Sequence, residues 1–153
     1  MDLMHQHDID DAVTAALKED IGSGDITALL LLKTQWVEGT IISREPMVMC
    51  GQAWANQAFR AVDTSTKVEW LVPEGAFLEQ PTILATITGP ARGVLTAERT
   101  ALNFLQTLSA TASLTREYVL ALAGTGVKLL DTRKTIPGLR LAQKYAVRAG
   151  GGQ

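Results

Sequence analysis

Two adjacent cations, Arg133 and Lys134, stand out in the stretch DTRKTIPGLR over residues 131–140. An arginine offers a planar fork of donors that suits a carboxylate, and a lysine offers a compact charge for a second anion. The pair could therefore bind a dicarboxylate or a phosphate, with Thr132 as a candidate supporting residue. An Arg-Lys dipeptide by itself is more commonly a solvated turn, so its meaning depends on the surrounding elements.

The residues around this pair predict a strand, a polar loop and a helix, in that order. The run VKLL over 127–130 is short and apolar, which is typical of a parallel strand covered on both faces. Pro137 suits the first turn of a helix that continues through LRLAQKYAVRAGGG. Loops that leave the carboxyl ends of parallel strands commonly form active sites, and this position favours a functional role for the pair.

A third cation, Arg99, lies in a long apolar stretch over residues 95–123. The stretch favours helix, but small and β-branched residues crowd together at 109–113, so we expect two helices with a break there. Arg99 falls on the same turn as the apolar surface. The pattern alone predicts that it lies along that surface, or pairs with Glu98 or a partner chain, rather than serving a site.

The first ninety residues alternate between helical and strand-like patterns without a strict βαβ order. Such a mixture predicts an α+β domain built from packed layers. The expected elements are a helix over 8–20, two strands between 36 and 51, a helix over 52–62, and strands over 66–72 and 82–88.

Several residues in this first part could suggest a site, but their context favours structural roles. Asp25, in the glycine-rich segment IGSGDIT, is expected to cap or turn the backbone, because aspartate readily accepts from nearby amides. His5 and His7 have no accompanying ligands at metal-binding spacing and are expected to be solvated. The tryptophans fall on periodic elements, which predicts core packing for Trp36, Trp54 and Trp70.

Composition bounds the class of protein. With 46% hydrophobic and 20% charged residues, the 153-residue chain can bury the core of an ordinary soluble domain. Its net charge of −2 excludes a bulk positive field that would attract nucleic acid or an anionic membrane. The single cysteine, Cys50, cannot form an internal disulfide and is expected to be buried. The acidic N-terminus and the lack of an apolar stretch of about 20 residues predict a cytoplasmic protein without a membrane span.

The segments ERTALNFLQTLSATAS and KLLDTRKTIPGLRLAQKYAVRAGGG resemble signature segments of quinolinate phosphoribosyltransferases. GSGDIT and GPARGVLTAERT match the same family in order and spacing, so the resemblance covers nearly the whole chain. It implies an N-terminal α+β sandwich and dimerisation domain over residues 1–115. Residues 116–153 would then be the truncated start of an incomplete β/α barrel, whose first strand-helix unit they contain.

The resemblance also implies a reaction. The 5-phosphoribosyl group of phosphoribosyl pyrophosphate would pass to quinolinate with decarboxylation, giving nicotinate mononucleotide, pyrophosphate and carbon dioxide in NAD biosynthesis. Arg133 and Lys134 would bind the carboxylates of quinolinate, and Arg99 would complete the site of the neighbouring subunit in a homodimer. Magnesium would hold the pyrophosphate, with none of its ligands among these residues.

Two alternatives stay open at this point. Related pyridine-carboxylate phosphoribosyltransferases share parts of these motifs, so the acceptor base could differ. The family pattern also continues past Gln153, and a β/α barrel takes about 250 residues, so the resemblance implies that these 153 residues alone are incomplete and inactive. A non-catalytic folded dimerisation fragment is the alternative to an enzyme.

Overall fold

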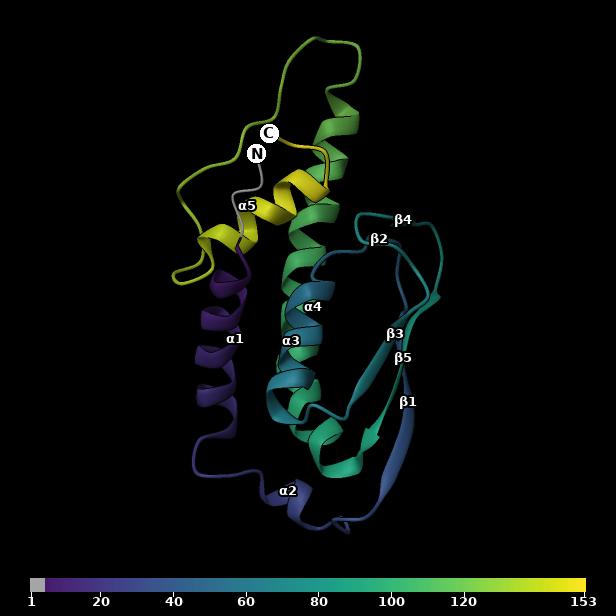
Figure 1. Cartoon of the computed structure of the whole chain (residues 1–153). Coiled ribbons are helices and arrows are strands. Elements are labelled where there is room, and N and C mark those ends of the chain that lie inside the picture. The colour runs from purple at the N-terminus through teal and green to yellow at the C-terminus, as the bar shows by residue number, and fades with distance from the viewer. Residues whose placement is uncertain (1–4) are drawn as a thin grey trace.

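The computed structural model describes residues 5–153 and shows a three-stranded sheet covered by helices (Figure 1). Helix α4 crosses one face of the sheet, α3 lies beside α4, and α1 and α5 pack on these helices from the side away from the sheet. The predicted α+β layers are therefore confirmed. In chain order the elements are α1 (Gln6–Ile21), α2 (Ile26–Leu29), β1 (Trp36–Ser43), β2 (Met47–Val48), α3 (Gln52–Val62), β3 (Lys67–Trp70), β4 (Phe77–Leu78), β5 (Thr82–Pro90), α4 (Ala91–Ala121) and α5 (Arg140–Ala149).

The described residues omit the first four residues of the acidic N-terminal segment, so the prediction made from that segment lies partly outside them. Within the described part, no helix combines the length and the apolar character needed to cross a membrane. His5 and His7 are exposed at the start of α1, where the backbone amide of His5 donates to Asp8 at 2.9 Å. Their predicted solvation is confirmed.

The three-stranded sheet has the order β1-β5-β3, with both pairings antiparallel. Its register shifts between Ile41, which faces Ala85, and Ile42, which faces Ile83. Leu84 therefore has no partner on β1, and this bulge lets Leu84 and Ala85 both be buried although they are neighbours in sequence. The short strands β2 and β4 pair separately.

Helix α4 is continuous from Ala91 to Ala121, so the predicted break at 109–113 is wrong. The small residues there serve close packing instead. The Ser109 hydroxyl accepts from the backbone amide of Cys50 at 3.1 Å and donates to its carbonyl at 3.0 Å. Ser113 accepts from the amide of Val48 at 2.8 Å. These hydroxyls satisfy buried backbone groups that a larger side chain would push away. The domain boundary predicted at residue 115 lies within α4, so this helix would belong to both predicted domains.

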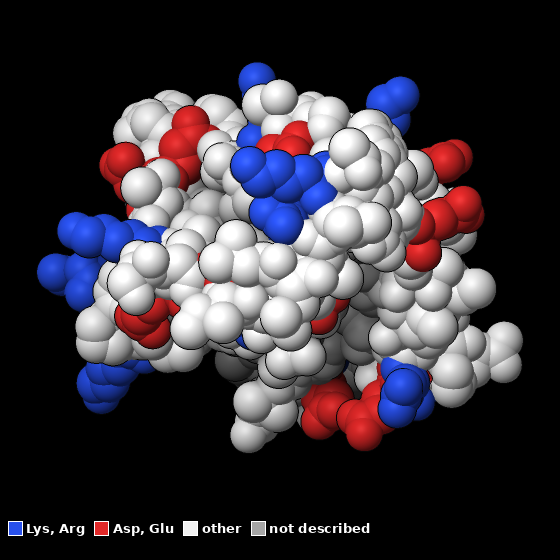
Figure 2. All heavy atoms as spheres, turned by 90° about the horizontal axis from the view of Figure 1, so that it is seen from below, with Lys and Arg blue, Asp and Glu red and all other residues white. Residues whose placement is uncertain are grey.

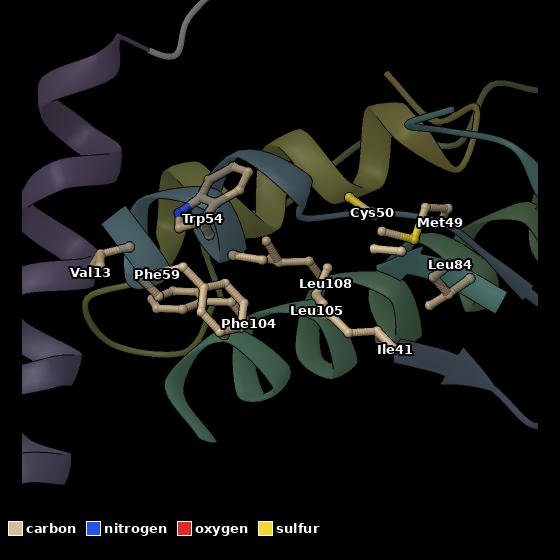
Figure 3. Packing of buried hydrophobic residues seen from close by; sticks show 14 of the residues in the cluster. Val13, Ile41, Met49, Cys50, Trp54, Phe59, Leu84, Phe104, Leu105 and Leu108 are labelled. Atoms are coloured by element: carbon tan, nitrogen blue, oxygen red, sulfur yellow. The ribbon is translucent and has the colours of Figure 1, made fainter. Parts of the chain in front are cut away.

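The core lies between α3, α4, α1 and the sheet (Figure 3). Trp54 and Phe59 of α3 meet Phe104 and Leu108 of α4, and all four are at most 5% exposed. Cys50 is fully buried beside them, as predicted, and burial raises the pKa of its thiol.

The predicted core packing of the three tryptophans is fully confirmed for Trp54 alone. Trp70 is partly buried, and its indole donates to Asn56 at 2.9 Å. Trp36 is 57% exposed, contrary to the prediction, because it opens the edge strand β1. An alternating strand pattern does not distinguish an edge position from a central one.

The predicted strand at 127–130 is absent from the described residues, where the segment has no regular structure and is unpaired along most of its length. Toward its end it bonds with Gln153, whose amide donates to Leu129 at 2.8 Å and whose carbonyl accepts from Asp131 at 2.7 Å. This is the slanted pattern of a parallel pair. One such pairing does not form a ladder, which needs several of them in succession.

Helix α5 starts later than predicted. Pro137 and Gly138 form a turn closed by the amide of Leu139, which donates to Ile136 at 3.1 Å, and the helix begins at Arg140. Gly138 has φ of 80°, a conformation that favours glycine. Pro137 therefore occupies the second position of a turn and not the first turn of the helix.

Glu74 joins α5 to the N-terminal part of the chain. Its carboxylate accepts from the amides of Gly51, at 2.7 Å, and Gln52, at 3.1 Å, where α3 begins. The Tyr145 hydroxyl of α5 donates to the same carboxylate at 3.1 Å. One acidic side chain thus caps α3 and orients α5.

The end of α5 lies very close to α4, and this contact can be tested at Gly150. A β-carbon there would collide with the carbonyl oxygen of Ala112 and lie 2.7 Å from Cβ of Thr115. We expect Gly150→Ala to lower the free energy of unfolding by about 1–3 kcal/mol in urea denaturation, because the backbone must move. Gly39→Ala is the control, since nothing lies within 4 Å of a β-carbon at that position. Equal stability of both variants would contradict this packing.

Candidate active site

The Arg133–Lys134 pair lies on the loop between α4 and α5, and both side chains are exposed. Thr132 shapes this loop, because its hydroxyl accepts from the backbone amide of Lys134 at 3.1 Å. Such a turn leaves both cationic side chains on the solvent side of the backbone. The structure thus places the three candidate residues of this segment together.

An ion pair anchors the loop to α5. Lys144 donates to Asp131 at 2.5 Å, and the two side chains are only 25% and 19% exposed. At the other end of the loop, the amide of Ile136 donates to the side chain of Gln143 at 2.7 Å. Side chains of α5 therefore hold the loop at both ends and fix its shape.

A small cavity of about 140 Å³ opens beside the pair. Its lining includes Lys134 and the hydroxyl side chains of Thr111, Thr132 and Thr135, together with the Lys144–Asp131 ion pair. Arg133 is not among the lining residues. Cations and hydroxyl donors are the groups that bind carboxylate or phosphate oxygens. A small anion would meet there the hydroxyl groups and Lys134, which forms no ion pair among residues 5–153.

Arg99 makes two ion pairs within its own chain, and neither involves Glu98. Its Nε donates to Asp20 at 3.1 Å, and its Nη2 donates to Asp25 at 3.3 Å. The predicted pairing with Glu98 is therefore wrong. On the helix Glu98 projects next to Arg99 at a different angle, whereas Asp20, in the last turn of α1, and Asp25, before α2, pack on this turn of α4.

Asp25 caps α2, as predicted, and also does more. Its Oδ1 accepts from the amide of Ala28, and its Oδ2 accepts from the Thr96 hydroxyl, each at 3.1 Å. The Ala28 amide, the Thr96 hydroxyl and the Arg99 guanidinium hold the pKa of Asp25 below its usual range. The contacts of Asp20 and Asp25 with Arg99 were missed from the sequence, because no spacing relates residues more than 70 positions apart.

No contact joins Arg99 to Arg133 or Lys134 among the described residues. Arg99 contacts Asp20 near the end of α1, whereas loop residues 135–138 line a cavity of about 550 Å³ with Asp8 and Asp11 near the start of α1. Between these places lies a second cavity, of about 700 Å³, which residues 136–139 line together with Asp20 and Thr100. At a rise of 1.5 Å per residue, these places are on the order of 15 Å apart along the helix. Figure 1 shows the loop and the α1–α2 connection at opposite ends of α1.

The described part of the chain does not contain a cluster of metal ligands. Residues 5–153 contain no group of three or more His, Cys, Asp or Glu side chains placed to hold an ion. The two neighbouring carboxylates, Asp20 and Asp25, face Arg99. These residues therefore do not fit a magnesium site, because its oxygen ligands would have to be free.

Two family models match the chain. The N-terminal domain of quinolinate phosphoribosyl transferase matches residues 25–109, and the C-terminal domain of the same family matches residues 111–153. The chain therefore belongs to the quinolinate phosphoribosyltransferase family, and the resemblance seen in its sequence is confirmed.

Individual relatives carry the corresponding enzyme name. The chain is 40% identical over 134 residues to a probable nicotinate-nucleotide pyrophosphorylase (carboxylating) of Bacillus subtilis, covering 88% of this chain and 46% of the relative. It is 43% identical over 148 residues to the Mycobacterium leprae enzyme of that name, covering 93% and 51%. The structure of the Francisella tularensis nicotinate-nucleotide pyrophosphorylase superimposes with a TM-score of 0.93 at 42% identity, covering 99% of this chain and 54% of that one. The chain thus spans about half the length of the curated relatives it matches.

The lowered pKa of Asp25 makes part of the stability depend on pH. A carboxyl group whose pKa is lower in the folded than in the unfolded state stabilises the fold fully above its ordinary value, here 3.8, and less as the pH falls through the folded-state pKa. We expect Asp25→Asn, which keeps the cap, to lower Tm at pH 7. The difference from the unmodified chain should shrink below pH 3.8.

Thermal unfolding followed by circular dichroism from pH 7 to about pH 2.5 measures this difference. Arg60→Ala is the control, because it removes an exposed charged side chain outside this cluster. A Tm difference between Asp25→Asn and the unmodified chain that stays constant over the whole range would contradict the charged interactions assigned to Asp25.

Proposed function

We propose that this chain supplies the quinolinate-binding half of a quinolinate phosphoribosyltransferase. The enzyme would transfer the 5-phosphoribosyl group of phosphoribosyl pyrophosphate to the ring nitrogen of quinolinate, giving nicotinate mononucleotide, pyrophosphate and carbon dioxide for NAD biosynthesis. The observation that carries the proposal is the anchored Arg133–Lys134 loop, bordered by an anion-sized cavity, in a chain of this family. The relatives' names describe the same chemistry.

The residues of this chain would act by placement and charge. The guanidinium of Arg133 would form a two-point contact with one carboxylate of quinolinate, and the Lys134 ammonium would hold the other. With both carboxylates held, the ring nitrogen has one orientation toward the anomeric carbon, and positioning of this kind can supply much of a rate enhancement. After the transfer, the positively charged ring nitrogen would stabilise the electron pair left on the adjacent carbon as carbon dioxide departs, and that carbon would then take up a proton from water.

We also propose that residues 127–149 are the first strand-helix unit of the family's incomplete β/α barrel, following a first domain over 1–115. The parallel hydrogen bonds between Gln153 and the segment 129–131 support this assignment. In such a barrel the loop after the first strand would open at the active-site face.

A homodimer would bring Arg99 to the site of the neighbouring subunit. The distance between Arg99 and the Arg133–Lys134 loop within one chain supports this proposal. So does an apolar patch next to Asp25, in which four side chains are 64–82% exposed. Figure 2 shows this end of the molecule with mostly uncharged atoms across its middle. The patch consists of Ile26, Leu29, Leu30 and Leu32.

Two further parts of the proposal concern magnesium and location. Magnesium would serve the pyrophosphate in the complete enzyme, with ligands from outside residues 5–153, since the described residues do not fit its site. A cytoplasmic location is supported by Cys50, because a lone buried thiol is suited to a reducing compartment.

The binding role of Arg133 can be tested in the complete enzyme, meaning residues 1–153 continued by the rest of the second domain. Arg133→Ala should raise the quinolinate KM by about 100-fold or abolish turnover, because a charge-assisted two-point contact is lost. Steady-state kinetics measure this, with Arg60→Ala as the control that removes an exposed arginine elsewhere. A normal quinolinate KM in Arg133→Ala would remove this residue from the site.

The shared site predicts recovery of activity in mixed dimers. At a quinolinate concentration well below their raised KM values, Arg99→Ala and Arg133→Ala should each show little turnover. After subunit exchange, half of the dimers combine the two variants, and each of these has one site with both arginines intact, so about a quarter of normal activity should return. Failure to recover activity, with mixed dimers shown by mass spectrometry, would mean that Arg99 does not act across the subunit boundary.

A further inference from the structure

The guanidinium of Arg99 is held along one edge. Its Nε lies 3.1 Å from Oδ1 and 3.3 Å from Oδ2 of Asp20, and its Nη2 lies 3.1 Å from Oδ2 of Asp20 and 3.3 Å from Oδ2 of Asp25. The third nitrogen, Nη1, has no hydrogen bond to any of residues 5–153, and the side chain is 44% exposed. Both N–H groups of Nη1 are therefore open to a ligand.

The two carboxylates that hold this edge are themselves fixed. Asp25 is 6% exposed at the side chain, and its oxygens also accept from Ala28 and Thr96. Asp20 lies in the last turn of α1, after which the chain reverses at Gly24, whose amide donates to Ile21 at 2.8 Å. Gly24 has φ of 138°, which L side chains rarely adopt, so the glycine is required for the reversal that brings the two aspartates together.

This arrangement changes what Arg99 can do. A free arginine loses much rotamer freedom when it binds a ligand, and an arginine already held in one orientation loses less. The neighbouring carboxylates also outnumber the guanidinium, so Arg99 is a poor long-range attractor of anions. It can still recognise a carboxylate by direction, through the donors of its free edge.

We propose that Asp20 and Asp25 are positioning residues that hold the Arg99 guanidinium by its Nε–Nη2 edge and present Nη1 to a carboxylate of quinolinate. The glycine-rich GSGDIT segment thereby gains a role in substrate binding through Arg99, in addition to capping α2. This inference rests on the proposed function, because it assumes that Arg99 binds quinolinate in the neighbouring subunit.

The competing explanation is a surface ion pair that contributes only to folding. Exposed pairs of this kind often contribute little, and their removal affects stability without selecting one substrate. The two explanations differ in whether the effect of the aspartates passes through Arg99. A double-mutant cycle measures that dependence directly.

The experiment uses the complete enzyme with Asp20→Asn, Asp25→Asn and the double variant, each made with and without Arg99→Ala. Asparagine keeps the cap at position 25 but removes the negative charge that holds the guanidinium. The double variant should raise the quinolinate KM by about 3- to 10-fold, while kcat and the KM for phosphoribosyl pyrophosphate change less than about twofold. In the Arg99→Ala background the same replacements should cause no further rise.

Asp63→Asn is the matched control. Asp63 also turns the backbone, accepting from the amide of Ser65 at 2.9 Å, but it contacts no arginine among the described residues. Its replacement should leave the quinolinate KM unchanged. If the double variant folds poorly, the single Asp20→Asn carries the test, because Asp20 caps no helix.

Three outcomes would overturn the inference. An equal rise in quinolinate KM with and without Arg99 would show a general structural effect. An unchanged KM in the aspartate variants, with a raised KM in Arg99→Ala, would reject the positioning role and leave the proposed function intact. An unchanged quinolinate KM in Arg99→Ala itself would reject both.

Discussion

Close packing along α4 determines where every other part of this chain lies. The helix carries Arg99 near its start, and near its end it receives both the segment before α3 and the end of α5. Its small residues allow those contacts, since serine hydroxyls pair with buried backbone groups and Ala112 leaves room for Gly150. Because a helix of this length is stiff, the 13 residues from Arg99 to Ala112 set a separation of about 20 Å between the two cationic regions.

The cations of the two regions are prepared in different ways. Arg133 and Lys134 are exposed on a backbone whose ends are tied to α5, so they keep their charge for a ligand while the loop keeps its shape. Arg99 is held in one orientation by Asp20 and Asp25, and these carboxylates also offset its positive charge. In a chain with a net charge of −2, binding of a dianion must come from such local arrangements and not from a general positive field.

Periodicity predicted most of the elements but not their relations. The helix over 52–62 and the strand from residue 82 were located well, because each has a regular apolar face. The same small residues that suggested a break near Ser109 turned out to be the closest contact surface of α4. Propensity cannot separate these cases, since a residue that weakens an isolated helix can also permit tight packing.

The candidate site shows the same limit more strongly. Its Arg133–Lys134 pair was identified from a local stretch together with a family resemblance, whereas the partners of Arg99 lie 74 and 79 positions away in sequence. Contacts of that range depend on the packing of α1 against α4, which no pattern within one segment encodes. The Asp131–Lys144 pair has an intermediate separation in sequence. A helix that follows an extended segment folds back along it, so an acid at the end of that segment and a base in the second turn of the helix can meet.

The contacts that shape the Arg133–Lys134 loop all lie between residues 131 and 144. They form although the segment 127–130 is unpaired along most of its length, so the geometry of the loop does not require a completed sheet. A neighbouring strand would add backbone partners below the loop, as Gln153 already does for Leu129 and Asp131. The shape of the Arg133–Lys134 loop is therefore determined by its own short sequence, whereas the orientation of Arg99 depends on the packing of α1 against α4.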